Sequence, residues 1–181
     1  MGFRIDEKEA AEKIKKIKML IFDVDGVLTN GDLIFGQDGS EYKRFSVQDG
    51  LGFTLARQAG LKTGMITARN SKIVERRAAE LKVDAFSQGN NNKLPALKEM
   101  IEKFGLRAEE TAYMGDDLLD LVLFDRVGFS AAPASARPEV LHRVDYVADA
   151  KGGDGAARQV IEAVLKIQKK WQGILERLEK N

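Results

Sequence analysis

The sequence predicts an α/β fold in which a parallel β-sheet carries helices on both faces. Short apolar runs alternate with longer amphipathic segments through most of the chain, and strands that alternate with helices are typical of parallel sheets. The length of 181 residues fits one domain and leaves little room for a second. Hydrophobic residues make up 44% of the sequence, which is enough apolar material for a core. We therefore expect residues 1–181 to form a single domain.

The first elements are a helix and a buried strand. Between residues 5 and 18, apolar side chains recur at helical spacing. The apolar run 19–22 that follows is too short for a helix and ends in Asp23-Val24-Asp25-Gly26. We interpret this run as a buried strand that leads into a turn.

Residues 33–45 carry the clearest hairpin signal. The pair Asp38-Gly39 separates two short runs that contain apolar residues, and an Asp-Gly pair in this position favours a β-hairpin. A hairpin of this size is not stable alone. We expect the hairpins of neighbouring subunits to pack together and to bury Leu33, Phe35 and Tyr42.

Strands and helices alternate after residue 49. The predicted strands are short apolar runs at 62–67, 83–86, 111–114, 127–130 and 146–147. The predicted helices are longer periodic segments at 51–59, 71–81, 93–104 and 118–124. Asn70 or Ser71 is a suitable N-cap for the second helix.

The segment 155–181 reads as one long helix. Its apolar seam includes Val164, Trp171, Ile174 and Leu178, and this three-four spacing is close to a heptad. Gly173 interrupts the pattern at a cost of about 1 kcal/mol. The seam suits packing on the chain's own domain and contact with another subunit about equally.

Composition excludes several chemistries. The formal net charge of +1 gives no indication of a nucleic acid or membrane partner. The chain has no cysteine and a single histidine, His142, so disulfides, thiolate sites, cysteine nucleophiles and multi-histidine metal centres are excluded. We expect His142, which lies outside every motif, on the surface. The N-terminal residues lack the apolar core of a signal peptide, and no window approaches the roughly 18 apolar residues of a membrane span. A cytoplasmic protein is the simplest interpretation.

Polar side chains follow four of the predicted strands. Asp23 and Asp25 follow the first, Thr67 ends the second, Lys93 comes after the third and Asp116 follows the fourth. Ligands of open parallel sheets bind beyond the carboxyl ends of the strands, so we expect these groups to share one crevice. Their oxygen atoms suit a hard divalent cation. A calcium loop is the alternative for Asp23-Val24-Asp25-Gly26 alone, but the further ligands and the closing glutamate of such a loop are missing.

Longer segments extend this pattern into a family resemblance. They are IFDVDGVLTNG, FSVQDGLGF, MITARNSKIVERRAAEL, QGNNNK, YMGDDLLDL and GGDGAARQV. Together they resemble the 3-deoxy-D-manno-octulosonate 8-phosphate phosphatases of the haloacid dehalogenase-like superfamily, in the family's order and over nearly the whole chain from Met19. The resemblance implies the Rossmann-like fold of that superfamily with a projecting hairpin at 33–45.

The resemblance also implies roles for the strand-end residues. Asp23 would be the nucleophile that attacks phosphorus, and Asp25 would protonate the leaving oxygen and then activate water. Asp23 and Asp116 would bind Mg²⁺ through their side chains and Asp25 through its backbone carbonyl. Thr67 and Lys93 would hold the phosphoryl oxygens.

Further residues would orient groups or bind the sugar acid. Asp117 and Asp120 would orient Lys93 or metal-bound water. By position, the sugar contacts fall on Asp25, Lys93, Arg69, Arg77 and the loop Ser46-Val47-Gln48-Asp49-Gly50; a solvent-facing role for Arg77 is the structural alternative. The chain departs from the family at Ala68, where relatives usually have glycine, and at Asp154, where they often have a basic residue.

The implied function is Mg²⁺-dependent hydrolysis of 3-deoxy-D-manno-octulosonate 8-phosphate, a step of lipopolysaccharide synthesis. One alternative is a phosphatase for a nine-carbon, sialic-acid-like 9-phosphate, and another is a non-catalytic regulatory domain of the same fold. Side-by-side turnover of the eight-carbon and the nine-carbon sugar phosphate would distinguish the two phosphatase activities. The regulatory domain is disfavoured because such domains usually lose a motif residue.

The sequence leaves no room for a cap domain between the motifs. A bare crevice would expose the reaction to water, so we expect another subunit to cover it. The resemblance implies a homotetramer in which a neighbour's segment 152–158 helps to close each site.

Overall fold

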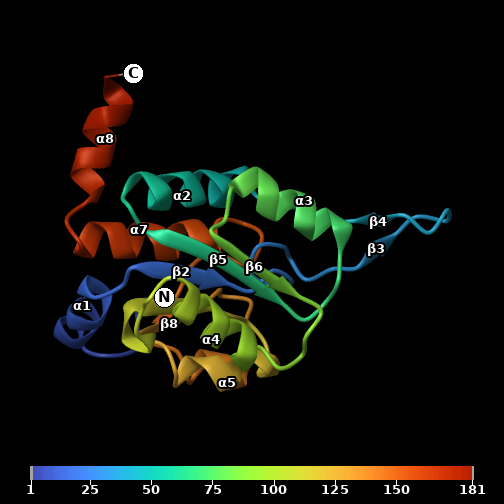
Figure 1. The fold of residues 1–181 in the computed structure, drawn as a ribbon, viewed down its shortest axis with the longest axis horizontal. Coiled ribbons are helices and arrows are strands. Elements are labelled where there is room, and N and C mark those ends of the chain that lie inside the picture. Colours follow the sequence, from blue (N-terminus) through green and yellow to red (C-terminus); the bar gives the residue numbers. More distant parts are fainter. Residues whose placement is uncertain (1, 181) are drawn as a thin grey trace.

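A computed structural model describes residues 2–180 (Figure 1). Within them, seven strands form one sheet in the order β1-β9-β8-β7-β2-β5-β6. All neighbouring strands in this sheet are parallel except β1, which pairs antiparallel with β9. The strands are β1 (Gly2–Phe3), β2 (Met19–Phe22), β5 (Lys62–Thr67), β6 (Ala85–Gln88), β7 (Thr111–Met114), β8 (Phe129–Ala132) and β9 (Tyr146–Val147).

Helices cover both faces of the sheet (Figure 1). In β2, Leu20 and Phe22 belong to one buried apolar cluster, and Met19 and Ile21 belong to the other, as the alternation of side chains along a strand requires. The α-helices of the described chain are α1 (Glu7–Lys15), α2 (Val47–Gln58), α3 (Lys72–Leu81), α4 (Leu94–Lys103), α5 (Leu121–Phe124), α6 (Pro138–Leu141), α7 (Ala156–Ile167) and α8 (Trp171–Glu179). Two short 3₁₀ turns, η1 (Ala108–Glu110) and η2 (Leu118–Asp120), flank β7.

The sheet has a switch point at β2. From β2 the chain builds β5 and β6 on one side and later returns to build β7, β8 and β9 on the other. Phe22, the last residue of β2, pairs with Met65 of β5 and Met114 of β7. The carboxyl ends of the three central strands are therefore nearly level, which is where open α/β sheets bind ligands.

The predicted α/β fold is confirmed, and so are the strands at 19–22, 62–67, 111–114 and 146–147. The strand predicted at 83–86 lies at 85–88, because Val83 still closes α3 through a hydrogen bond from its N–H to Ala78. The strand predicted at 127–130 likewise lies at 129–132. The antiparallel strand β1 and the short helix α6 were not expected. His142 is exposed, as predicted.

The single helix predicted at 155–181 is wrong. α7 ends at Ile167, and Lys169 takes a left-handed conformation with φ 58°. The N–H of Lys170 bonds to the carbonyl of Leu165 and that of Lys169 to Lys166, which is the Schellman pattern of a helix end. The Gln168 side-chain amide donates to the carbonyls of Ile14 and Ile17, so α1 fixes the break.

The second terminal helix, α8, extends away from the sheet (Figure 1). Gly173 lies inside α8 and does not end it. Of the predicted seam, Val164 and Ile174 are fully buried in the chain's own core, whereas Leu178 is 46% exposed. Part of the seam therefore packs within the chain.

The predicted hairpin projects from the body of the molecule (Figure 1). Its strands are β3 (Ile34–Phe35) and β4 (Glu41–Tyr42), which pair antiparallel. Several large apolar side chains remain exposed, among them Phe35 at 62% and Tyr42 at 56%.

The segments between the motifs are small. Between β2 and β5 the chain forms the hairpin and α2, and between β5 and β7 it forms α3, β6, α4 and η1. Neither segment of the described chain builds a separate cap domain. In residues 2–180, no helix has both the length and the apolar character that crossing a membrane requires.

Candidate active site

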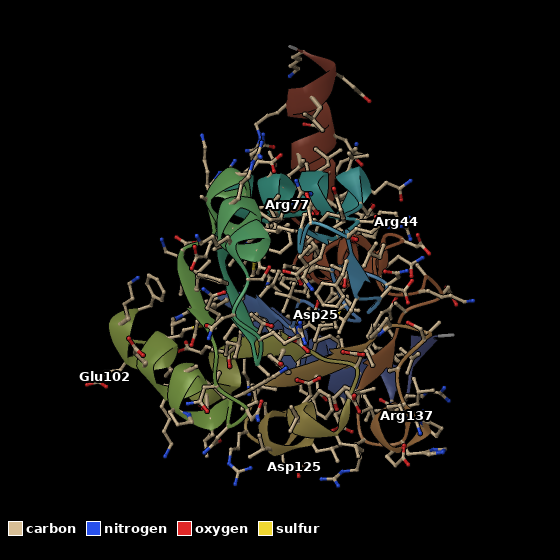
Figure 2. All side chains as sticks on the ribbon, turned by 90° about the vertical axis from the view of Figure 1, so that its right-hand side faces the viewer. Asp25, Arg44, Arg77, Glu102, Asp125 and Arg137 are labelled. Carbon is tan, nitrogen blue, oxygen red and sulfur yellow. The ribbon has the colours of Figure 1, made fainter. Side chains whose placement is uncertain are left out.

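Three carboxylates meet at the carboxyl end of the sheet. Asp23 follows β2, and its N–H donates to the carbonyl of Met114 at the end of β7. Asp116 comes two residues after β7, and Asp120 ends η2. Each of the three offers an oxygen within 4.8 Å of the others. Figure 2 views this end of the molecule, with Asp25 near the middle.

Gly26 allows the two acidic segments to approach each other. Its φ is +88°, a conformation that favours glycine. A Cβ at this position would lie 2.0 Å from Oδ2 of Asp116, so no other residue fits without displacing that carboxylate. The glycine of the Asp-x-Asp-Gly motif thus has a packing reason.

Lys93 links the nucleophile candidate to the rest of the cluster. Its Nζ lies 2.8 Å from Oδ2 of Asp23 and 2.6 Å from Oδ1 of Asp120, and it donates to the Tyr113 hydroxyl at 3.2 Å. The side chain is only 2% exposed. Burial alone would lower the pKa of Lys93, but the charges of Asp23 and Asp120 outweigh it and raise the pKa. Lys93 is therefore a fixed cation.

Asp120 is saturated with donors. Oδ1 accepts from Lys93 and from the Tyr113 hydroxyl, and Oδ2 accepts from the N–H groups of Asp116 and Asp117 at 2.9 and 3.1 Å. A carboxylate has about four lone-pair sites, so none is left for a cation. Asp120 thus contacts Lys93, as the prediction that it orients Lys93 requires. Asp117 instead caps η2, where its side chain accepts from the N–H of Leu118.

Burial and the charges of neighbouring carboxylates raise the pKa values of the acidic groups at the centre of the site. Burial raises the pKa of Asp23 to about 7, although Lys93 opposes the shift. Burial also raises the pKa of Asp116 to about 8, with further contributions from Asp23 and Asp120. Oδ1 of Asp116 is buried and has no hydrogen-bond partner. Carboxylate oxygens in this state fit a divalent cation such as Mg²⁺, which binds hard oxygen ligands and favours their charged form.

A cavity of about 340 Å³ opens beside these carboxylates. The cavity brings together every predicted strand-end residue, including Thr67, which is 2% exposed. Thr67 Oγ1 accepts weakly from the N–H of Arg69 at 3.4 Å. The lining residues are Asp23, Asp25, Gly31, Thr67, Ala68, Arg69, Asn91, Lys93, Asp116, Asp117, Leu119 and Asp120.

Larger cavities of the described chain lie elsewhere, and one of about 530 Å³ lies between the ends of α1 and α7. Its charged lining is mostly lysine, with Glu110 as the acidic member. We assign the candidate site to the 340 Å³ cavity, because converging carboxylates with raised pKa values are the stronger mark of a functional site.

The loop predicted to bind the sugar lies outside the 340 Å³ cavity. Ser46 caps α2, and Val47 is 83% exposed. Asp49 is buried and accepts from the N–H groups of Gly155 and Arg158 at 3.3 and 2.9 Å, so it holds the start of α7. Gln48 and Gly50 also do not line this cavity.

The two predicted arginines have different surroundings. Arg69 lines the cavity and is 45% exposed. Arg77 lies apart from Asp25 in Figure 2 and does not line the cavity. It donates to the carbonyl of Ser46 at 3.1 Å and lies over the ring of Phe45, so it supports the start of α2.

The sequence did not reveal two hairpin residues that reach the site. The Lys43 ammonium forms an ion pair with Asp25 and lies 3.5 Å from Oε1 of Glu41. Glu41 and Lys43 are two residues apart, so they share the face opposite Tyr42. That alternation was the one available signal. Asp154, where the chain departs from the family, is also paired with a hairpin residue: Arg44 lies 2.8 Å from its carboxylate.

A parallel sheet of this order, with an acidic cluster after its central strand, is the arrangement of haloacid dehalogenase-like hydrolases. A model of that family matches residues 82–160. The relatives narrow the class further. The 3-deoxy-D-manno-octulosonate 8-phosphate phosphatase of Escherichia coli (strain K12) is 42% identical over 158 residues, which is 87% of this chain and 84% of that protein. The chain therefore belongs to the 3-deoxy-D-manno-octulosonate 8-phosphate phosphatase family.

Solved structures agree with this membership. The phosphatase of that family from Moraxella catarrhalis, in complex with magnesium, phosphate and KDO, is 37% identical with a TM-score of 0.92, covering 96% of this chain and 99% of that one. The cobalt-bound phosphatase from Haemophilus influenzae is 39% identical with a TM-score of 0.84, covering 87% and 92%.

Proposed function

We propose that the protein hydrolyses 3-deoxy-D-manno-octulosonate 8-phosphate to the free sugar acid and phosphate, through an aspartyl-phosphate on Asp23. The observation that carries the proposal is the contact of Asp23 with Lys93 inside a carboxylate cluster at the strand ends. The substrate is chosen because the relatives of known name act on it.

Asp23 is suited to attack phosphorus. Its Oδ1 accepts from the N–H of Val24 at 2.7 Å, and its Oδ2 faces Lys93. Both contacts fix the carboxylate before the substrate arrives, which lowers the entropy cost of reaching an in-line geometry. Lys93 and the hydroxyl of Thr67 line the same cavity, where they would hold the phosphoryl oxygens and stabilise the charge that develops on them.

The side chains of Asp23 and Asp116 and the backbone carbonyl of Asp25 would hold Mg²⁺. When bound, the cation supplies positive charge that offsets the repulsion between the phosphate ester and Asp23. The unpartnered Oδ1 of Asp116 supports this assignment. Asp120 would keep Lys93 and the segment of Asp116 in place.

Asp25 would act as general acid and then as general base. It lines the cavity two residues after the nucleophile, and its Oδ2 is buried without a hydrogen-bond partner. It would give a proton to the leaving sugar oxygen and later take one from the water that attacks the aspartyl-phosphate. Such proton transfer contributes about 10²- to 10⁴-fold.

Arg69 would meet the carboxylate of the sugar acid; its position in the cavity lining and its partly exposed guanidinium support this role. For Arg77 and residues 46–50 we propose a role at the site of a neighbouring subunit in a homotetramer. Residues 47–50 form the first turn of α2 rather than a loop, and Asp49 ties this turn to Gly155 and Arg158, so both segments would lie in one interface. The exposed apolar hairpin, which a neighbour would bury, supports the assembly. Because phosphorylated sugars do not cross membranes unaided, we place the reaction in the cytoplasm.

Phosphate release from a panel of sugar phosphates, with Mg²⁺ and with chelator, tests the proposal. We expect the eight-carbon substrate to be hydrolysed fastest, with no turnover in chelator. In the wild type we expect a phosphoenzyme that survives an acid quench. Asp23→Asn should abolish both turnover and this phosphoenzyme, whereas the matched control Asp125→Asn, at an exposed carboxylate, should retain both. Faster turnover of a nine-carbon 9-phosphate would show that the eight-carbon sugar is not the preferred substrate. Activity in Asp23→Asn would refute the mechanism.

A further inference from the structure

Lys43 is a buried charge on an otherwise exposed hairpin. Its side chain is 1% exposed, whereas its neighbour Tyr42 and the facing residues Ile34 and Phe35 are all about half exposed or more. A lysine is almost never buried to this extent unless it is paired. The Lys43 side chain is therefore directed into the protein and needs partners there.

The partners of Lys43 form a chain of polar contacts. Its ammonium is paired with Oδ1 of Asp25 and lies 3.5 Å from Oε1 of Glu41. The other oxygen of Glu41 accepts from the hydroxyl of Ser71 at 2.9 Å, and Ser71 is the N-cap residue of α3. Lys43 is thus held between an anchored glutamate and the acid–base candidate.

This contact distinguishes the two oxygens of Asp25. Oδ1 is occupied by Lys43, while Oδ2 is buried without a hydrogen-bond partner and lies 4.0 Å from Nε of Arg69. Asp25 lines the 340 Å³ cavity, but Lys43 does not. Lys43 would therefore act through Asp25, whereas Lys93 lies in the cavity itself.

We propose that Lys43 is a positioning residue, which fixes the Asp25 carboxyl group so that Oδ2 faces the leaving oxygen. The inference rests on the proposed function, because it assigns Asp25 the proton transfer. It makes the hairpin, through Lys43 and Glu41, a part of the active site of its own chain. Losing Lys43 would let the carboxyl group rotate, and it would then reach the leaving oxygen in only a fraction of encounters.

The test is a double-mutant cycle on turnover of the sugar phosphate. Lys43→Met should lower kcat about tenfold or more, which is part of the 10²- to 10⁴-fold that proton transfer contributes, and should change KM less than about threefold. Lys43→Arg, which keeps the charge and the donors, should recover part of the loss. In an Asp25→Asn background, Lys43→Met should have no further effect on kcat, because residues that act as a unit are not additive. Lys98→Met, on an exposed lysine of α4, is the matched control and should match the wild type.

A leaving-group comparison supplies a second readout. An aryl phosphate such as p-nitrophenyl phosphate needs little protonation of its leaving group, so Lys43→Met should slow the nitrophenol burst much less than it slows alkyl phosphate cleavage. Wild-type kcat in Lys43→Met, or an equal loss in the Asp25→Asn background, would overturn the inference. A variant that melts earlier is replaced by Lys43→Gln in the same cycle. A wild type that cleaves no sugar phosphate would refute the proposed function instead, and that result is read before any variant.

Discussion

Replacing Asp116 by asparagine should stabilise the metal-free protein while removing its response to Mg²⁺. The cluster sets the carboxylates of Asp23, Asp116 and Asp120 within 4.8 Å of one another, with Lys93 as the cation between Asp23 and Asp120. An asparagine at this position would keep the shape of the side chain but could not ionise. The change removes repulsion from a buried site, so its effect on stability should be opposite to that of most substitutions.

The size of the effect follows from the pKa of Asp116. Burial and the neighbouring carboxylates raise it from the ordinary value of 3.8 to about 8. At pH 7 the folded state still holds a proton that the unfolded state has released. The pH then lies roughly three units above the unfolded-state pKa, which corresponds to about 4 kcal/mol of lost stability. Because the Asp23 and Asp116 charges raise each other's pKa, we expect a gain of about 2 to 4 kcal/mol in the free energy of unfolding.

Because the pKa of Asp116 is raised on folding, the pH range in which stability changes can be stated. Between about pH 4 and pH 8 the folded state binds more protons than the unfolded state, so the stability of the metal-free wild type should fall as pH rises. Below pH 4 both states are protonated at this carboxyl group, and the advantage of Asp116→Asn should disappear. Above pH 8 the advantage should reach a plateau.

Urea unfolding in chelator at pH 4, 5.5, 7 and 8 measures these changes. Mg²⁺ should then raise the stability of the wild type, by mass action on the folded state, and leave Asp116→Asn unchanged. Asp125→Asn, the same substitution on an exposed carboxylate paired with Arg143, should stay within about 0.5 kcal/mol of the wild type at every pH. A destabilised Asp116→Asn, or a gain that does not depend on pH, would refute the electrostatic reasoning.

Two further outcomes follow from packing. Gly26→Ala places a Cβ 2.0 Å from Oδ2 of Asp116 and strains a φ of +88°. We expect at least a tenfold loss of Mg²⁺ affinity by calorimetry and a lower melting temperature. Unchanged Mg²⁺ affinity would contradict the close approach of the two segments. Phe35→Asp adds a charge to the exposed hairpin face, where Phe35 is 62% exposed. Sedimentation should show dissociation of the proposed tetramer with little change in the fold, and a variant that stays tetrameric would move the interface elsewhere.

The strands that build the site were predictable because they are short apolar runs that end in polar residues. Met19–Phe22 is entirely apolar. Thr111–Met114 contains Thr111 and Tyr113, but both residue types are common in strands. Once the runs are placed in parallel, their carboxyl ends meet at one edge, and Asp23 and Asp116 must approach each other. Local sequence was therefore enough for the centre of the site.

Other features depend on contacts between distant residues. The break between α7 and α8 is fixed by Gln168 bonding to carbonyls of Ile14 and Ile17, about 150 positions earlier, and Lys169 takes the left-handed position that glycine usually fills. The role of Asp49 in holding the start of α7 is likewise a contact over more than a hundred positions. No periodicity within either segment contains this information.

The charges around the cavity explain why the site needs both a cation and the hairpin. In the network of contacts that joins the site to the hairpin, five carboxylates face three cationic side chains. Full ionisation would leave two excess negative charges, and this repulsion adds to burial in raising the pKa values of Asp23 and Asp116. A divalent cation would balance this excess, and an anionic substrate could then enter without net repulsion. Lys43 reduces the excess on the side of Asp25, away from Lys93, so the two lysines serve different carboxylates. The residues in this balance are Asp23, Asp25, Glu41, Asp116 and Asp120 against Lys43, Arg69 and Lys93.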